Sequence, residues 1–156
     1  MRRFSLRSLP FGPSDEAWVE LPVEVEPFIL GGETYEAEGG MADLDLTIAR
    51  VGDRYTLSGE VVAVLVGPCQ RCLEEARIEV VAEGTETALR GESEGVDDED
   101  EPYVSGWSLD VGRWVRDLIG TALPLTLLCR DDCRGLCPVC GADLNKAGPG
   151  HRHEPE

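Results

Sequence analysis

Apolar and polar side chains alternate through much of the first 90 residues, which is the pattern of β-strands with one buried face. The clearest alternation covers residues 41–49, 54–66 and 76–83. Gly52-Asp53 separates the first two segments as a two-residue turn, and glycine at its first position favours a type II′ hairpin. The middle segment becomes apolar on both faces in its second half, as expected of a central strand. Together the segments predict a three-strand antiparallel meander.

The chain before this meander predicts shorter or less regular strands. Residues 17–25 alternate regularly, but Pro22 has no backbone donor and therefore places this strand at a sheet edge or on an irregular segment. Residues 2–9 predict a short strand. Residues 33–38 lie between two glycine pairs and predict a short exposed strand or a loop.

A single amphipathic helix is predicted after residue 108. The residues on its apolar stripe, at i, i+3 and i+4 spacing, are Val111, Trp114, Val115, Leu118, Ile119 and Ala122. Ser108 or Asp110 can cap its first turn, and it should stop before Pro124. We expect Trp114 to pack in the core rather than to stack on a nucleotide base. The apolar segment 125–128 then leads the chain back towards the turn before residue 76.

The C-terminal tail contains four closely spaced cysteines that are candidate metal ligands: Cys129, Cys133, Cys137 and Cys140. Cys137-Pro-Val-Cys140-Gly141 has the form of a zinc knuckle, in which proline stiffens the turn and Gly141 tolerates the backbone angles that the second sulfur requires. Thiolates at this spacing can converge on one tetrahedral Zn(II) ion at about 2.3 Å. Buried free or disulfide-bonded cysteines are the alternative. The pattern favours a metal site.

Two further pairs extend this set to eight nitrogen and sulfur ligands. Cys69 and Cys72 form a second Cys-x-x-Cys, and His151 and His153 follow the tail cysteines. Eight ligands suffice for two closed four-coordinate zinc ions, and closed sites are structural rather than catalytic. The sequence leaves open how they are shared. A local site of the four tail cysteines is simplest, and a ribbon-like pairing of Cys69 and Cys72 with one downstream cysteine pair is the alternative. His151 and His153 are either ligands or polar tail residues.

Cys69 and Cys72 also allow a redox interpretation. A thioredoxin-type pair needs its first cysteine at a helix N-terminus, which lowers the thiol pKa. Here the motif falls in the second turn of the predicted meander, where a zinc ribbon places a knuckle. The position therefore favours metal binding over thiol–disulfide exchange.

Residues 91–102 hold seven acidic residues and no basic one. Self-repulsion and low apolar content favour a mobile linker, with a cation site or a docking strip for a basic partner as alternatives. We therefore expect a mostly β region over 1–90, an acidic linker over 91–107, and a helix with a zinc-binding segment packing on the sheet over 108–156. The whole chain should form one compact α+β unit.

Composition narrows the classes of function. The chain has 14 basic and 31 acidic residues, a net charge of −17, so direct high-affinity RNA binding is disfavoured and a basic protein partner suits better. We find no nucleophile flanked by a base and no phosphate-binding glycine loop, which argues against an enzyme and a small-molecule substrate. Neither a secretory signal nor a membrane-spanning run is evident. We expect a cytoplasmic protein with reduced cysteines.

Several motifs together resemble the YceD family, the large ribosomal RNA subunit accumulation proteins. They are Cys69-Gln-Arg-Cys72-Leu-Glu, the helix ending in Leu123-Pro124, and Gly135-Leu-Cys-Pro-Val-Cys-Gly141 followed by Asp143-Leu-Asn145. The resemblance runs from about residue 40 to the C-terminus. Metal-bearing members often end in Cys-x-Cys, where this chain has His151-Arg-His153. Imidazole also binds zinc, so the change is compatible with ligation.

This resemblance implies a role in accumulation or processing of large-subunit ribosomal RNA and no chemical reaction. We therefore expect a non-enzymatic ribosome-biogenesis factor with one or two structural Zn(II) ions. Its partner would be a ribosomal protein or a large-subunit ribosomal RNA assembly intermediate. Two other classes remain open. An RNA-binding zinc module would need a basic face formed by Arg71, Arg130, Arg134 and Arg152. A thiol–disulfide enzyme would use Cys69 and Cys72.

Overall fold

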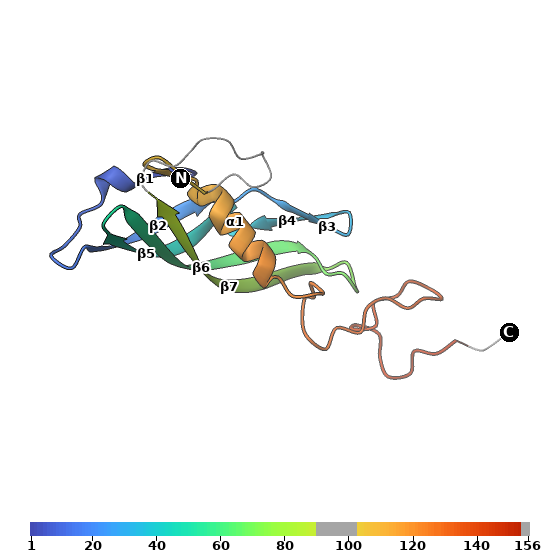
Figure 1. Cartoon of the computed structure of the whole chain (residues 1–156). Helices are drawn as coiled ribbons and strands as arrows, with labels where there is room; N and C mark the ends of the chain where they lie inside the picture. The colour runs from blue at the N-terminus through green and yellow to red at the C-terminus, as the bar shows by residue number, and fades with distance from the viewer. Residues whose placement is uncertain (90–102, 154–156) are drawn as a thin grey trace.

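The computed structural model describes residues 1–89 and 103–153, and Figure 1 shows their arrangement. The main element of the described chain is one six-stranded antiparallel sheet. Its strands are β2 (Glu16–Glu24), β3 (Phe28–Leu30), β4 (Glu33–Ala37), β5 (Met41–Val51), β6 (Arg54–Pro68) and β7 (Glu75–Leu89). The fold is mostly β with one α-helix, so the expected α+β class overstates its helical content.

The long strand β6 organises the sheet and confirms the predicted meander. Its whole length pairs with β7, from Arg54 opposite Leu89 to Pro68 opposite Glu75. On its other side, β5 pairs with the first part of β6 and β4 with the last part. Gly52 in the β5–β6 turn has φ +62°, which glycine adopts without steric cost and which a type II′ turn requires. β6 is therefore the central strand.

The outer strands fit the rules for edges. β2 pairs only with β5 within the described sheet, so Pro22 lies on an edge strand, which was the first of the two predicted alternatives. Residues 33–37 form a true strand, β4, which pairs with both β3 and the end of β6. The loop alternative for this segment is therefore wrong.

Helix α1 (Val111–Ala122) covers one face of the sheet (Figure 1). The Asp110 carboxylate accepts a hydrogen bond from the backbone amide of Arg113 at 3.1 Å, which caps the first turn. Trp114, Val115 and Ile119 are fully buried, so Trp114 is a core residue as expected. The helix approaches the sheet closely because two paired glycines lie beneath it, and a Cβ atom on Gly84 would lie 2.3 Å from Leu118 Cδ2.

A second, three-stranded sheet joins the N-terminus to the segment before the helix. It consists of β1 (Phe4–Ser5), β8 (Val104–Ser105) and β9 (Ser108–Leu109), with β9 in the middle. The strand predicted for residues 2–9 is shortened to β1 because a 3-10 helix, Leu6–Ser8, follows. A second 3-10 helix, Glu38–Gly40, precedes β5. Residues 91–102 of the expected linker lie outside the described residues, whereas residues 103–107 contribute β8.

After α1, the tail contains no further helix or strand longer than an isolated Leu136–Asp143 bridge within the described residues. Figure 1 shows it leaving the helix near the β6–β7 turn and continuing beyond the end of the sheet. Contacts of the tail with that turn hold it in position. The described part of the chain has no helix long and apolar enough to cross a membrane.

Candidate metal centres

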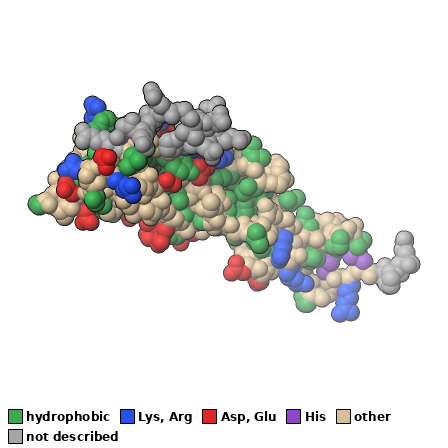
Figure 2. Space-filling view, in the orientation of Figure 1, with side chains coloured by type: hydrophobic (Ala, Val, Ile, Leu, Met, Phe, Trp, Pro, Cys, Tyr) green, Lys and Arg blue, Asp and Glu red, His purple; other side chains and the backbone are tan. Residues whose placement is uncertain are grey.

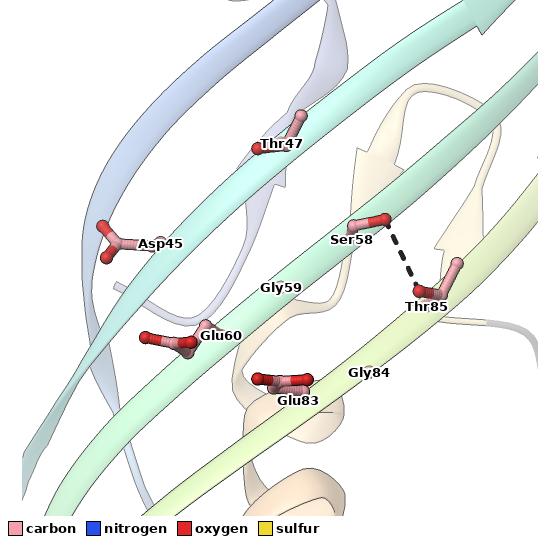
Figure 3. A pocket seen from close by; sticks show the side chains of 8 residues that line it. All are labelled: Asp45, Thr47, Ser58, Gly59, Glu60, Glu83, Gly84 and Thr85. Carbon is pink, nitrogen blue, oxygen red and sulfur yellow. Dashed lines mark hydrogen bonds between the residues drawn. The ribbon is translucent and has the colours of Figure 1, made fainter.

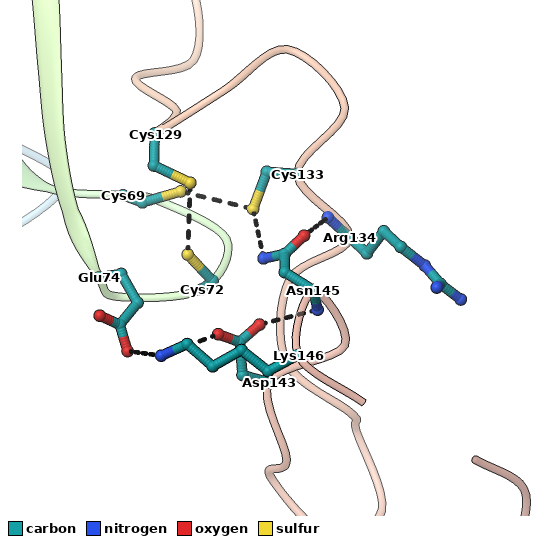
Figure 4. A network of polar contacts seen from close by, with 9 residues as sticks. All are labelled: Cys69, Cys72, Glu74, Cys129, Cys133, Arg134, Asp143, Asn145 and Lys146. Carbon is teal, nitrogen blue, oxygen red and sulfur yellow. Dashed lines mark hydrogen bonds and ion pairs between the residues drawn. The ribbon is translucent and has the colours of Figure 1, made fainter. Parts of the chain in front are cut away.

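Four cysteines from two distant parts of the chain meet at the β6–β7 turn. Cys69 and Cys72 lie in the turn itself, and Cys129 and Cys133 come from the tail (Figure 4). Their Sγ atoms all lie within 4.8 Å of one another, with Cys69–Cys133 at 3.7 Å and Cys72–Cys129 at 3.6 Å. A tetrahedral ion with Zn–S bonds of about 2.3 Å places its ligand atoms about 3.8 Å apart. This first cluster therefore fits a zinc ion.

The first cluster is closed to solvent on most sides. Cys69, Cys72 and Cys133 expose 0%, 4% and 3% of their surface, and Cys129 is half-buried. Ala76 is buried beside them, and Ile78, Leu128 and Leu136 pack around the group. Four protein ligands without an open position are characteristic of structural metal sites.

The tail is attached to the turn by a reciprocal pair of hydrogen bonds. The Gln70 backbone amide donates to the Leu127 carbonyl at 2.9 Å, and the Leu127 amide donates to Gln70 Oε1 at 3.0 Å. Arg71 Nη1 also donates to the Cys133 carbonyl at 3.0 Å. These contacts bring Cys129 and Cys133 to the pair from the turn.

The thiol pKa values in the first cluster are driven apart. Burial alone would raise the pKa of Cys69, but amide donors from Cys72, Cys129 and Arg71 together lower it to about 6. Burial raises the pKa of Cys129 to about 12, and hydrogen bonding to the other thiols acts in the same direction. Four adjacent sulfurs cannot all ionise unless a cation lies between them. A dication would remove this restriction.

A second cluster lies farther along the tail and contains Cys137, Cys140, His151 and His153. Cys137 Sγ lies 3.2 Å from His153 Nε2, and Cys140 Sγ lies 3.6 Å from His151 Nε2. The two Nε2 atoms are 3.2 Å apart, and all four candidate ligand atoms lie within 4.8 Å of one another. Two thiolates and two imidazoles at this spacing also suit tetrahedral zinc.

The knuckle that carries Cys137 and Cys140 has the expected backbone geometry. The Gly141 amide donates to the Cys137 carbonyl at 2.8 Å, and Gly141 has φ +73°, in the region that favours glycine. Hydrogen bonding to the Cys140 backbone amide lowers the pKa of Cys137 to about 6, and the hydrogen bond with the His151 side chain is the second cause of this shift. Cys140 and His153 are exposed, so the second cluster is more open to solvent than the first.

Asn145 joins the first cluster to the next part of the tail, and sequence reasoning missed this role. Its Nδ2 donates to Cys133 Sγ at 3.3 Å, and its Oδ1 accepts from the Arg134 amide at 2.8 Å (Figure 4). Its own amide donates to Asp143 Oδ1 at 2.9 Å. Lys146 then bridges Asp143 to Glu74 in the β6–β7 loop, with Nζ–O distances of 3.5 and 2.8 Å. The position of Asn145 shortly after the knuckle is the sequence feature that could have indicated this role.

The structure thus divides the eight candidate ligands differently from the simplest expectation. The described residues do not form a local site from Cys129, Cys133, Cys137 and Cys140. Instead, the first tail pair joins Cys69 and Cys72, and the second joins the two histidines. This is the ribbon-like alternative. As predicted, Cys69 lies in the hairpin turn that follows β6 and does not start a helix.

The basic face required of an RNA-binding module is only partly available. Arg71 is engaged with the Cys133 carbonyl, and Arg130 pairs with Asp132 at 3.3 Å. The Arg134 side chain extends away from the first cluster (Figure 4). Figure 2 shows Lys and Arg side chains on the tail, but not a continuous basic surface there.

The fold and the two clusters define a class of protein, an antiparallel sheet with a C-terminal tail and two cysteine and histidine clusters that can hold metal ions, the first of them at a hairpin turn. The chain belongs to the YceD family, described as large ribosomal RNA subunit accumulation protein YceD, whose family model matches residues 57–156. This match includes all eight candidate ligands.

The chain is also similar to individual proteins, one of which carries the family's name. An uncharacterised protein of Mycobacterium tuberculosis (strain H37Rv) is 32% identical over 98% of this chain and 85% of its own length. An uncharacterised Mycobacterium leprae protein is 30% identical over 74% of this chain and 54% of its own. The chloroplastic large ribosomal RNA subunit accumulation protein YCED homolog 1 of Arabidopsis thaliana is 40% identical, over 24% of this chain and 12% of its own. No solved structure is significantly similar to the chain.

Proposed function

We propose that this protein is a non-enzymatic factor that supports the accumulation of large-subunit ribosomal RNA, and that its two clusters hold structural Zn(II) ions. The observation that carries the role in ribosomal RNA is the family match over residues 57–156. The matched region contains most of β6, all of β7, α1 and the whole tail. Its partner would be a ribosomal protein or a large-subunit assembly intermediate, and its place of action the cytoplasm.

The donor sets support zinc as the metal. Thiolate and imidazole ligands suit Zn(II), and each cluster supplies four of them within 4.8 Å. A bound ion would neutralise the thiolates and connect segments that are otherwise joined by few hydrogen bonds. Cys69 and Cys72 would then hold the start of the tail against the sheet, while the second cluster would fix the tail to itself.

The way the reactive groups are used supports a structural rather than a catalytic role. The chain has two histidines, and both lie in the second cluster, so neither is left as a separate general base. Cys69 has a lowered pKa, as a redox cysteine would, but it exposes 0% of its surface and so cannot readily attack a disulfide. Both features favour metal ligation.

The role in ribosomal RNA can be tested by deleting the gene in the organism of origin and measuring the ratio of large- to small-subunit ribosomal RNA. We expect the ratio to fall and the wild-type chain to restore it. The Cys69→Ser/Cys72→Ser variant should restore it poorly, whereas Asp53→Asn, in the opposite β5–β6 turn, should restore it fully. An unchanged ratio after deletion would contradict the proposal.

A further inference from the structure

Four carboxylates form one row across the sheet face opposite α1. Glu20 on β2 lies directly opposite Asp45 on β5, Asp45 opposite Glu60 on β6, and Glu60 opposite Glu83 on β7. All four side chains are exposed. Figure 3 shows the last three on neighbouring strands. Because adjacent strands lie only about 4.8 Å apart, each carboxylate is next to another of the same charge.

No ion pair between residues that the structure describes includes any of these four carboxylates. The basic residues at outward positions of β6 and β7 are Arg54 and Arg77, which lie towards opposite ends of the strands, and Arg77 pairs with Glu38. Like charges directly opposite one another destabilise a sheet. A cationic partner would relieve this repulsion on binding.

Apolar side chains border the row on both sides. Trp18, two residues before Glu20 on the same face, is 58% exposed. Val62 and Val81 lie opposite each other, one outward position along from Glu60 and Glu83, and are 37% and 53% exposed. Thr47, Ser58 and Thr85 line an open hollow of about 600 Å³ together with three of the carboxylates, Asp45, Glu60 and Glu83. The face therefore combines negative charge with exposed aromatic and aliphatic surface.

We propose that this acidic face, defined by Glu20, Asp45, Glu60, Glu83, Trp18, Val62 and Val81, is the docking surface for a Lys- and Arg-rich segment of a protein partner. Basic side chains can place their charged ends on the carboxylates and their aliphatic stems on the valines. A guanidinium can also stack on Trp18. Nucleic acid fits poorly, because its phosphates would meet the row of negative charges.

The inference rests on the proposed function for its biological setting, because it names the chemistry of the partner. Its test needs only the zinc-loaded full chain and a fluorescently labelled peptide that alternates Lys or Arg with small polar residues. Binding is measured by fluorescence anisotropy at low salt and again at about 0.5 M salt, where surface charges are screened. Absence of binding can thus be distinguished from an absent effect on ribosomal RNA.

The decisive comparison uses two variants that lose the same net charge. Glu60→Gln/Glu83→Gln should weaken peptide binding about tenfold at low salt, whereas the control Asp53→Asn/Asp131→Asn should weaken it less than about twofold. At high salt, Trp18→Ala should still reduce the remaining affinity. Equal losses in the two double variants would show attraction by net charge alone and overturn the proposal. It would also be overturned if Glu60→Gln/Glu83→Gln spared peptide binding but abolished binding of Mg²⁺ or Ca²⁺.

Discussion

The side-chain amide of Asn145 donates to Cys133 Sγ at 3.3 Å while its oxygen accepts from the Arg134 backbone amide at 2.8 Å. One residue therefore holds both the sulfur of a candidate ligand and the backbone that follows it. Hydrogen bonds of this kind orient metal ligands and stabilise their charged form. We infer that Asn145 is a positioning residue for the first cluster.

Replacing Asn145 with alanine should therefore weaken metal binding at the first cluster by about 10- to 100-fold. Competition between the protein and a chelator for Co(II), followed by the absorption of the bound ion, measures this affinity. Asp131→Asn changes an exposed tail residue and is the control. If Asn145→Ala bound Co(II) as tightly as the control, Asn145 would have no positioning role.

Each of the two clusters should bind one metal ion independently of the other. Native mass spectrometry of the wild-type chain should give two zinc ions, because the eight candidate ligands form two groups of four. Cys69→Ser/Cys72→Ser should lose one ion and release the tail from the β6–β7 turn, which faster amide exchange around Leu127 would report. Cys137→Ser/Cys140→Ser should lose the other ion and leave Leu127 protected. Loss of both ions in either variant would show that the clusters are not independent.

The absence of a side chain at Gly84 leaves room for Leu118 of α1 against the sheet. A Cβ atom there would lie 2.3 Å from Leu118 Cδ2, so Gly84→Ala should lower the free energy of unfolding by about 1–3 kcal/mol. Urea denaturation measures this loss. In a Leu118→Ala background, Gly84→Ala should lower the free energy of unfolding by less, because the clashing side-chain atom of Leu118 is absent. Equal costs in both backgrounds would place the strain elsewhere.

Tyr103 should make stability depend on pH in the alkaline range. Burial, with the hydrogen bond to Asp117 Oδ2 at 2.9 Å as a further cause, raises the pKa of Tyr103 to about 12 from its ordinary value of 10.0. The folded state therefore retains this proton more tightly than the unfolded state. The resulting stabilisation is complete below about pH 10 and is lost as the pH rises through about 12.

Ultraviolet titration of the folded protein checks this expectation. Tyr103→Phe should remove a component that ionises near pH 12 and should flatten the loss of stability between the two pKa values. The control is Tyr55→Phe, a buried tyrosine of the sheet, which should leave the Tyr103 component in place. A Tyr103 component that titrated near pH 10 would contradict the expectation.

Local physical chemistry made much of the fold predictable. Alternation with a period of two marks a strand wherever one face is buried, and this pattern predicted the β5–β6–β7 meander. Pro22, which lacks a backbone donor, indicated the edge position of β2. The cap of α1 was equally local, because Asp110 and the amide it accepts from are three residues apart. The spacing of the cysteines likewise indicated metal ligands.

The sequence alone determined which residues form the strands of the meander, the helix and the set of possible ligands, because each of these depends on neighbours a few residues away. Only the tertiary structure decided how the ligands are shared, because the meeting of Cys69 with Cys133 requires α1 to return the chain to a turn some sixty residues earlier. The acidic face could not be predicted from the sequence for the same reason. Glu20, Asp45, Glu60 and Glu83 become neighbours only through the strand register, which spacing along the chain does not reveal.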